Sequence, residues 1–129
     1  LELTRPFRGV RFWLPLKLFG VAPFRAALSE KICLARYFYT ELDKLPGWEL
    51  GPYPELSVVT YRFVPAHGDA DDFNQRLVAA VQADGRVFIS STLIDGSFYL
   101  RLAVLHFRTH LAQVDYLLAL LQRLVSEIR

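Results

Sequence analysis

An Asp-Gly pair between two β-rich runs is the feature that most constrains this fold. Asp95 and Gly96 separate the run Val87–Ser91 from the run Ser97–Val104. An Asp-Gly pair in this position is among the stronger local signals of a β-hairpin, because both residues tolerate the backbone of a tight turn. The sequence therefore predicts two antiparallel strands joined through Asp95-Gly96.

A third strand is predicted upstream of this hairpin. In Val58–Val64, apolar residues at the odd positions alternate with Thr60 and Arg62, which is the period of a half-buried strand. Trp48–Leu50 is a short extended piece that ends before a Gly- and Pro-rich breaker. We therefore expect a small, mostly antiparallel sheet of three to four strands.

Four other stretches carry apolar residues at the three- and four-residue spacing of amphipathic helices. Helices that pack on one face of such a sheet make an α+β domain, which is the fold class that the sequence predicts. The stretches are Phe12–Phe19 with Pro15 in its first turn, Pro23–Leu45, a stretch from an N-cap at Asp69 or Asp71 to Asp84, and Val114–Ile128.

Charge and cysteine content exclude several classes of function. Fifteen basic and 13 acidic residues are spread along the chain, so no polybasic tract indicates a nucleic-acid partner. The single cysteine, Cys33, rules out an internal disulfide framework and a cysteine zinc cluster, and a reducing cytoplasm is the expected location. The most apolar stretches are too short or too interrupted, by Lys17 and Arg123, to span a membrane.

Because the chain lacks any methionine and starts at Leu1, we expect it to be a piece of a longer protein.

Arg101 is the candidate ligand-binding residue. The alternation in Ser97–Val104 places Tyr99, Arg101 and Ala103 on the face that points away from the predicted helices. A guanidinium there could bind a carboxylate through its planar fork of N–H donors. From periodicity alone, a solvated charge on an outward sheet face is an equal interpretation.

Two other sets of residues carry weaker hypotheses. Arg5, Arg8 and Arg11 recur at three-residue intervals, so on a helical turn they would share a face and could pair with carboxylates of another domain or subunit. A solvated helix start explains them equally well. The three histidines are scattered along the chain without a neighbouring carboxylate or cysteine cluster, so no metal site is predicted.

Several separated motifs, in the same order along the chain, resemble those of one enzyme family. The matching stretches are Arg5–Trp13, Leu16–Val21, Gly85–Thr92, Phe98–Leu102 and Arg108–Asp115. In these motifs the chain is similar to the group II pyridoxal-phosphate-dependent decarboxylases, which include the aromatic-L-amino-acid decarboxylases. The resemblance covers essentially the whole chain and includes the order of the elements.

This resemblance implies that the chain is the C-terminal small domain of a fold type I enzyme. Residues 1–22 would link a large domain to the small domain at 23–129. The lysine that forms the Schiff base with pyridoxal phosphate is expected upstream of Leu1, since none of Lys17, Lys31 and Lys44 has the expected setting. The chain alone is therefore predicted to be inactive.

The resemblance also implies roles and partners. Arg101 matches an arginine of the family that would hold the carboxylate of the amino-acid substrate or order the site around it. The expected partners are the large domain, the substrate and a second subunit of a homodimer, with neither nucleic acid nor membrane. Two alternatives stay open: the small domain of another fold type I enzyme, such as an aminotransferase or a carbon–carbon lyase, and a stand-alone α+β module that binds amino acids. The sequence does not indicate which amino acid is the substrate.

Overall fold

The structure, a computed structural model, describes residues 8–128. Within this range the chain forms four helices and a four-stranded antiparallel sheet, which confirms the predicted α+β class. The helices are α1 (Val10–Phe19), α2 (Ala22–Asp43), α3 (Ala70–Asp84) and α4 (Leu111–Ile128), and the strands are β1 (Trp48–Leu50), β2 (Val58–Phe63), β3 (Ser90–Ile94) and β4 (Ser97–Ala103).

The predicted hairpin forms, but its first strand lies further along the chain than expected. Asp95 and Gly96 have φ of 49° and 80°, and Ile94 pairs with Ser97 directly beside them. A two-residue turn of this kind requires pairing up to its flanking residues, so β3 must run up to Ile94. The prediction of a strand over Val87–Ser91 was therefore wrong in its bounds, because it left residues 92–94 out of the sheet.

The four strands form one antiparallel sheet in the order β1-β2-β4-β3. The pairing of β2 with β4 sets Val59 opposite Leu102 and Tyr61 opposite Leu100, and all four side chains are buried. Arg101, between them in sequence, is exposed. The predicted division into an inner and an outer face is confirmed by the register of both strands. Tyr99 is an exception to the predicted burial, since it lies on the outer face with Arg101 but is buried.

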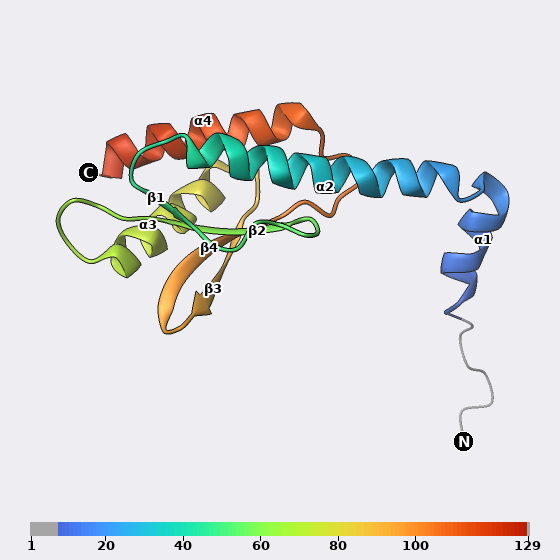
Figure 1. The fold of residues 1–129 in the computed structure, drawn as a ribbon, viewed down its shortest axis with the longest axis horizontal. Coiled ribbons are helices and arrows are strands. Elements are labelled where there is room, and N and C mark those ends of the chain that lie inside the picture. Colours follow the sequence, from blue (N-terminus) through green and yellow to red (C-terminus); the bar gives the residue numbers. More distant parts are fainter. Residues whose placement is uncertain (1–7, 129) are drawn as a thin grey trace, which may run out of the picture.

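Helices cover the inner face of this sheet. Both α2 and α3 contact the sheet, and α4 contacts α2 and α3. Figure 1 shows α2 and α4 running side by side along the body, with the sheet on one side of them. The largest fully buried side chains include Phe38 from α2, Leu77 from α3 and Leu121 from α4, which meet over the sheet in one hydrophobic core.

Two aspartates with different hydrogen-bond partners fix the start of α3. Asp69 is the N-cap, and its side chain accepts a hydrogen bond of 2.9 Å from the backbone N–H of Asp72. Asp71, the other residue predicted as a cap, instead accepts a 2.9 Å hydrogen bond from the backbone N–H of Phe98. This second bond ties the first turn of α3 to the beginning of β4.

Asn74 joins α3 to β2 inside the core. Its side chain is fully buried and accepts a 2.9 Å hydrogen bond from the backbone N–H of Phe63. Its amide nitrogen donates 2.7 Å hydrogen bonds to the carbonyl oxygens of Phe63 and Ala70. The end of β2 is thereby fastened to the helix layer by polar contacts as well as by packing.

Helix α1 lies beyond one end of the body, against the start of α2 (Figure 1). None of its residues is buried, and large apolar side chains such as Phe12, Trp13 and Phe19 are exposed. The helix begins at Val10, so Pro15 lies in its interior and not in its first turn as predicted. Pro15 cannot donate the hydrogen bond of a regular helix at this position.

Candidate functional site

Polar side chains gather on the outer face of the sheet, the face away from the helices. The strand register sets both Thr60 and Ser90 opposite Arg101, and it sets Glu49 opposite Arg62. Opposed residues in a sheet project to the same side. The outer face therefore combines side chains from all four strands, among them Glu49, Thr60, Arg62, Ser90, Tyr99 and Arg101.

Arg101 occupies an inner strand of this sheet, with its side chain exposed as the alternation predicted. Its Nε donates a 2.9 Å hydrogen bond to Oγ of Ser90 on the neighbouring strand. Within residues 8–128, no carboxylate lies within ion-pair distance of its guanidinium. Arg101 therefore presents a positive charge that the described part of the chain does not neutralise.

The other arginine of the outer face, Arg62, has a carboxylate partner. Its Nε and Nη2 lie 2.8 and 2.7 Å from Oε2 of Glu49, and its guanidinium stacks over the ring of Tyr99 at 5.0 Å from the centroid. The hydroxyl of Tyr99 donates a 2.6 Å hydrogen bond to the other oxygen of Glu49. Arg62 is thus held in a structural cluster, whereas Arg101 is open to a ligand.

Electrostatics within this cluster keep Glu49 ionised. Hydrogen bonds donated first by Tyr99 and then by Arg62 hold the pKa of the Glu49 carboxyl below its usual value. The same bond to Glu49 raises the pKa of the Tyr99 phenol, which therefore remains a donor at neutral pH. The cluster is therefore an ion pair between Arg62 and Glu49 with the phenol of Tyr99 hydrogen-bonded to it.

The lysines of the chain do not provide a covalent attachment point for pyridoxal phosphate. Lys31 is 4% exposed, and its ammonium donates to the carbonyl oxygen of Thr109 and to Glu30 at 2.8 Å. Lys44 pairs with Glu41 at 2.6 Å, and Lys17 lies on the surface of the last turn of α1. None of these amines lies on the outer face near Arg101, so the described residues do not fit covalent binding of this cofactor.

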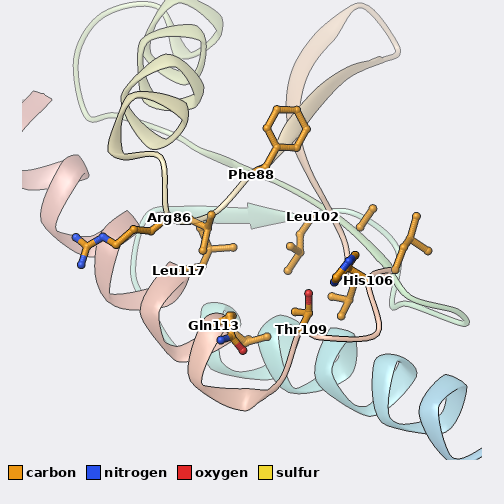
Figure 2. A pocket seen from close by; sticks show the side chains of 12 residues that line it. Arg86, Phe88, Leu102, His106, Thr109, Gln113 and Leu117 are labelled. Carbon is orange, nitrogen blue, oxygen red and sulfur yellow. The ribbon is translucent and has the colours of Figure 1, made fainter.

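A cavity of about 320 Å³ lies between the α3–β3 connection, the end of β4 and the start of α4. Figure 2 shows its wall, with His106, Thr109 and Gln113 as polar groups among apolar side chains such as Leu102. Leu102 belongs to the inner face, so this cavity opens on the side of the sheet opposite Arg101. It is therefore separate from the outer-face site.

Arg86, at the edge of this cavity, is engaged in another cluster. Its guanidinium lies 3.1 Å from Asp84 and 4.1 Å from the centroid of the Tyr116 ring, and it extends away from the cavity in Figure 2. The Tyr116 hydroxyl donates to both oxygens of Asp84 at 2.8 Å. These contacts join the end of α3 to α4, and sequence reasoning did not identify them because Tyr116 lies far from Asp84 in the chain.

We expect replacement of Asp84 by asparagine to weaken the fold in a pH-dependent way. Hydrogen bonds from Arg86 and then Tyr116 lower the pKa of Asp84 from 3.8 to about 2. A depressed pKa means that the ionised group stabilises the fold above pH 3.8, and that this contribution is lost as the pH falls through about 2. Urea unfolding of wild type and Asp84→Asn at several pH values measures this. A difference in unfolding free energy that stays constant from pH 7 to pH 2 would contradict the prediction.

The histidines hold no metal-binding arrangement in the described part of the chain. Nδ1 of His110 lies 2.7 Å from Glu30, next to Lys31, and Nδ1 of His106 accepts a 3.2 Å hydrogen bond from the backbone N–H of Arg108. No group of three or more potential ligands is found within residues 8–128. In the same range, no helix is long and apolar enough to cross a membrane.

The structure brings together only part of what the sequence predicted for this site. Arg101 lies on the outer face, whereas Arg8 and Arg11 lie at the start of α1, beyond one end of the body. Arg5 lies outside the described residues, so the predicted stripe of three arginines stays a prediction. Ser90 and Glu49 were not identified, because their positions on the outer face depend on strand pairing that composition does not reveal.

Comparison with known proteins gives consistent matches. No model of a protein family matches the chain. The chain is 36% identical over 107 residues to tyrosine decarboxylase 2 of Arabidopsis thaliana, and the matched region is 81% of this chain and 20% of that protein. It is 30% identical over 132 residues to the aromatic-L-amino-acid decarboxylase of Bacillus atrophaeus, and the matched region is 99% of this chain and 28% of that protein. The chain therefore spans between a fifth and a third of the length of these relatives.

Solved structures give the same picture. Tryptophan decarboxylase of Catharanthus roseus, in complex with L-tryptophan, superimposes with a TM-score of 0.87 at 26% identity, over 95% of this chain and 27% of that one. The 4-hydroxyphenylacetaldehyde synthase of Rhodiola rosea, at 20% identity, shares the fold with a TM-score of 0.89, over 99% of this chain and 28% of that one. These superpositions cover the helices, the sheet and its outer face together.

Proposed function

Because the chain matches the C-terminal region of the group II aromatic amino-acid decarboxylases, we propose that it forms the C-terminal small domain of a pyridoxal-phosphate-dependent amino-acid decarboxylase. In this proposal, residues 1–22 connect to a large domain and residues 23–129 form the small domain. The observation that most supports this proposal is the exposed guanidinium of Arg101, which has no carboxylate partner in residues 8–128. Three of the four proteins named above are decarboxylases by name, which favours loss of CO2 over transamination or the cleavage of another carbon–carbon bond.

Arg101 would hold the carboxylate of an amino-acid substrate at the interface with the large domain. A guanidinium stays charged at any working pH and offers paired N–H donors that match the two oxygens of a carboxylate. Its strand lies inside the sheet and is paired on both sides, so its backbone is well fixed. A rigid element is the favourable place for a group that must orient a substrate.

The cofactor would be held outside the described residues. When bound, pyridoxal phosphate supplies an electron sink for the bond that is broken during decarboxylation. The contribution of this chain would be to bind and orient the substrate and to shield it from water. The ammonium of Lys31, the most buried lysine, donates hydrogen bonds to Thr109 and Glu30. This supports the proposal that the lysine that binds the cofactor lies elsewhere in the protein.

The exposed apolar surface around α1 supports the large domain as a partner. A groove of about 680 Å³ runs between α1, the first turns of α2 and the β4–α4 connection. Contiguous apolar surface of this kind marks an interaction site. Among the residues that line the groove are Phe12, Leu16, Phe24, Leu28, Leu105 and Phe107. We include the homodimer and the cytoplasmic location in this proposal.

A domain replacement tests the proposal. In the decarboxylase chimera, this chain replaces the matching C-terminal region of the Bacillus atrophaeus enzyme. We expect the chimera to release CO2 from an aromatic L-amino acid in the presence of pyridoxal phosphate, because the chain supplies the missing substrate contacts. The same enzyme with its C-terminal region deleted, and the 129-residue chain alone, are the controls and should be inactive.

Two outcomes would contradict this proposal. A chimera with the mass and circular dichroism of a folded enzyme but without decarboxylation would count against the decarboxylase assignment. Submillimolar binding of free amino acids by the isolated chain, measured by calorimetry together with a light-scattering mass, would favour the stand-alone binding module.

A further inference from the structure

Ser90 and Arg101 form a closed pair across the β3–β4 ladder. They are register partners, and Nε of Arg101 donates a 2.9 Å hydrogen bond to Oγ of Ser90. The same hydroxyl lies 3.4 Å from the carbonyl oxygen of Arg101, which is a long and weak contact. The bond from Nε is therefore the stronger of the two contacts between these residues.

This pairing decides which edge of the guanidinium is available. A guanidinium can bind a carboxylate side-on, through Nε and one Nη, or end-on, through both Nη atoms. In Arg101 the Nε–H is taken by Ser90, so the side-on edge is blocked. Arg62, on the same face, uses its side-on edge for Glu49. Arg62 is therefore ion-paired with Glu49, whereas the two Nη atoms of Arg101 remain available to a ligand.

We propose that Ser90 is a positioning residue, which turns Arg101 so that it presents its end-on edge to the carboxylate of the amino-acid ligand. This inference rests on the proposed function of Arg101. Ser90 itself does not touch the ligand. It acts by restricting an exposed and flexible side chain to one orientation before the ligand arrives, which reduces the conformational freedom lost on binding.

The effect of Ser90 on binding should be modest and specific. Loss of one hydrogen bond that orients an arginine changes affinity by about threefold to tenfold. We therefore expect Ser90→Ala to raise the KM of the decarboxylase chimera by that factor and to leave kcat within about twofold. Threonine carries a hydroxyl on the same carbon, so Ser90→Thr should restore the wild-type KM.

A measurement on the 129-residue chain tests the pairing without any enzyme activity. Nuclear magnetic resonance of the Arg101 Nε–H group reports its exchange with water. We expect slow exchange in wild type and Ser90→Thr, and exchange about tenfold faster or more in Ser90→Ala, because the acceptor is lost. Ser91→Ala is the matched control, since Ser91 is exposed and faces the other side of the strand; it should resemble wild type.

The outcomes separate this inference from the proposed function. Fast exchange in wild type, equal to that in Ser90→Ala, would overturn the pairing. An unchanged KM in Ser90→Ala, together with a large loss of efficiency in Arg101→Lys, would overturn the positioning role and leave the function of Arg101 in place. Unchanged kinetics in both variants would overturn the function of Arg101, and the role of Ser90 with it.

Discussion

Replacement of Arg101 by lysine is expected to lower kcat/KM of the decarboxylase chimera about 30- to 150-fold, the equivalent of about 2–3 kcal/mol of transition-state binding. Lysine retains the positive charge but not the planar pair of donors that matches a carboxylate. Its ammonium also lacks a group equivalent to Nε, through which Ser90 orients the arginine. Steady-state kinetics with an aromatic L-amino acid measure the effect.

The control for this prediction is another exposed arginine. Arg76 lies on α3 and pairs with Asp72 at 3.1 Å, an exposed contact of small energetic value. Arg76→Lys should leave kcat/KM unchanged. Because Arg101 is exposed, its replacement should also leave the urea unfolding midpoint of the 129-residue chain unchanged, which separates loss of function from loss of fold. Wild-type kinetics in Arg101→Lys would remove Arg101 from the site.

Replacement of Asn74 by alanine is expected to destabilise the chain by about 3 kcal/mol, the largest stability effect that we predict. The change removes two buried hydrogen bonds, to the N–H and the C=O of Phe63, and a part-buried one to the C=O of Ala70. Each buried backbone group that loses such a partner carries a desolvation cost. The free energy of unfolding in urea, followed by circular dichroism, is the measurement.

Gln75 provides the matched control for Asn74. It is the next residue on α3, it carries the same amide group, and its side chain is exposed. Gln75→Ala should change the free energy of unfolding by no more than about 0.5 kcal/mol. If Asn74→Ala unfolded at the same urea concentration as Gln75→Ala, the hydrogen bonds to β2 would have no net role in stability.

The fold class could be predicted because apolar periodicity reflects burial directly. Alternation in β2 and β4 indicated the inner and outer faces, and that separation placed Arg101 on the outer face. The bounds of β3 were missed although the information was in the sequence. A two-residue turn at Asp95-Gly96 fixes Ile94 opposite Ser97, and weighting this geometry above the apolar run Val87–Ile89 would have given the correct strand.

The polar contacts of the site and the core could not be predicted in the same way. Ser90 orients Arg101 only because the hairpin register makes them partners, and a shift by one residue would send the serine to the other face. Asn74 lies between the buried Phe73 and Leu77 of α3 and looks like an interruption of an apolar stripe. Its partner Phe63 belongs to another element, so its role follows from tertiary packing alone.

Helix α1 has a thermodynamic consequence for any partner that covers it. A helix of 10 residues without a buried side chain, and with Pro15 in its interior, has little besides its own hydrogen bonds to keep it ordered. Its amide protons should exchange with solvent through local opening, whereas those around Leu100 and Leu121 exchange only when the core unfolds. Part of the free energy of docking against α1 is therefore spent on ordering it, so the affinity is lower than the buried area alone would suggest.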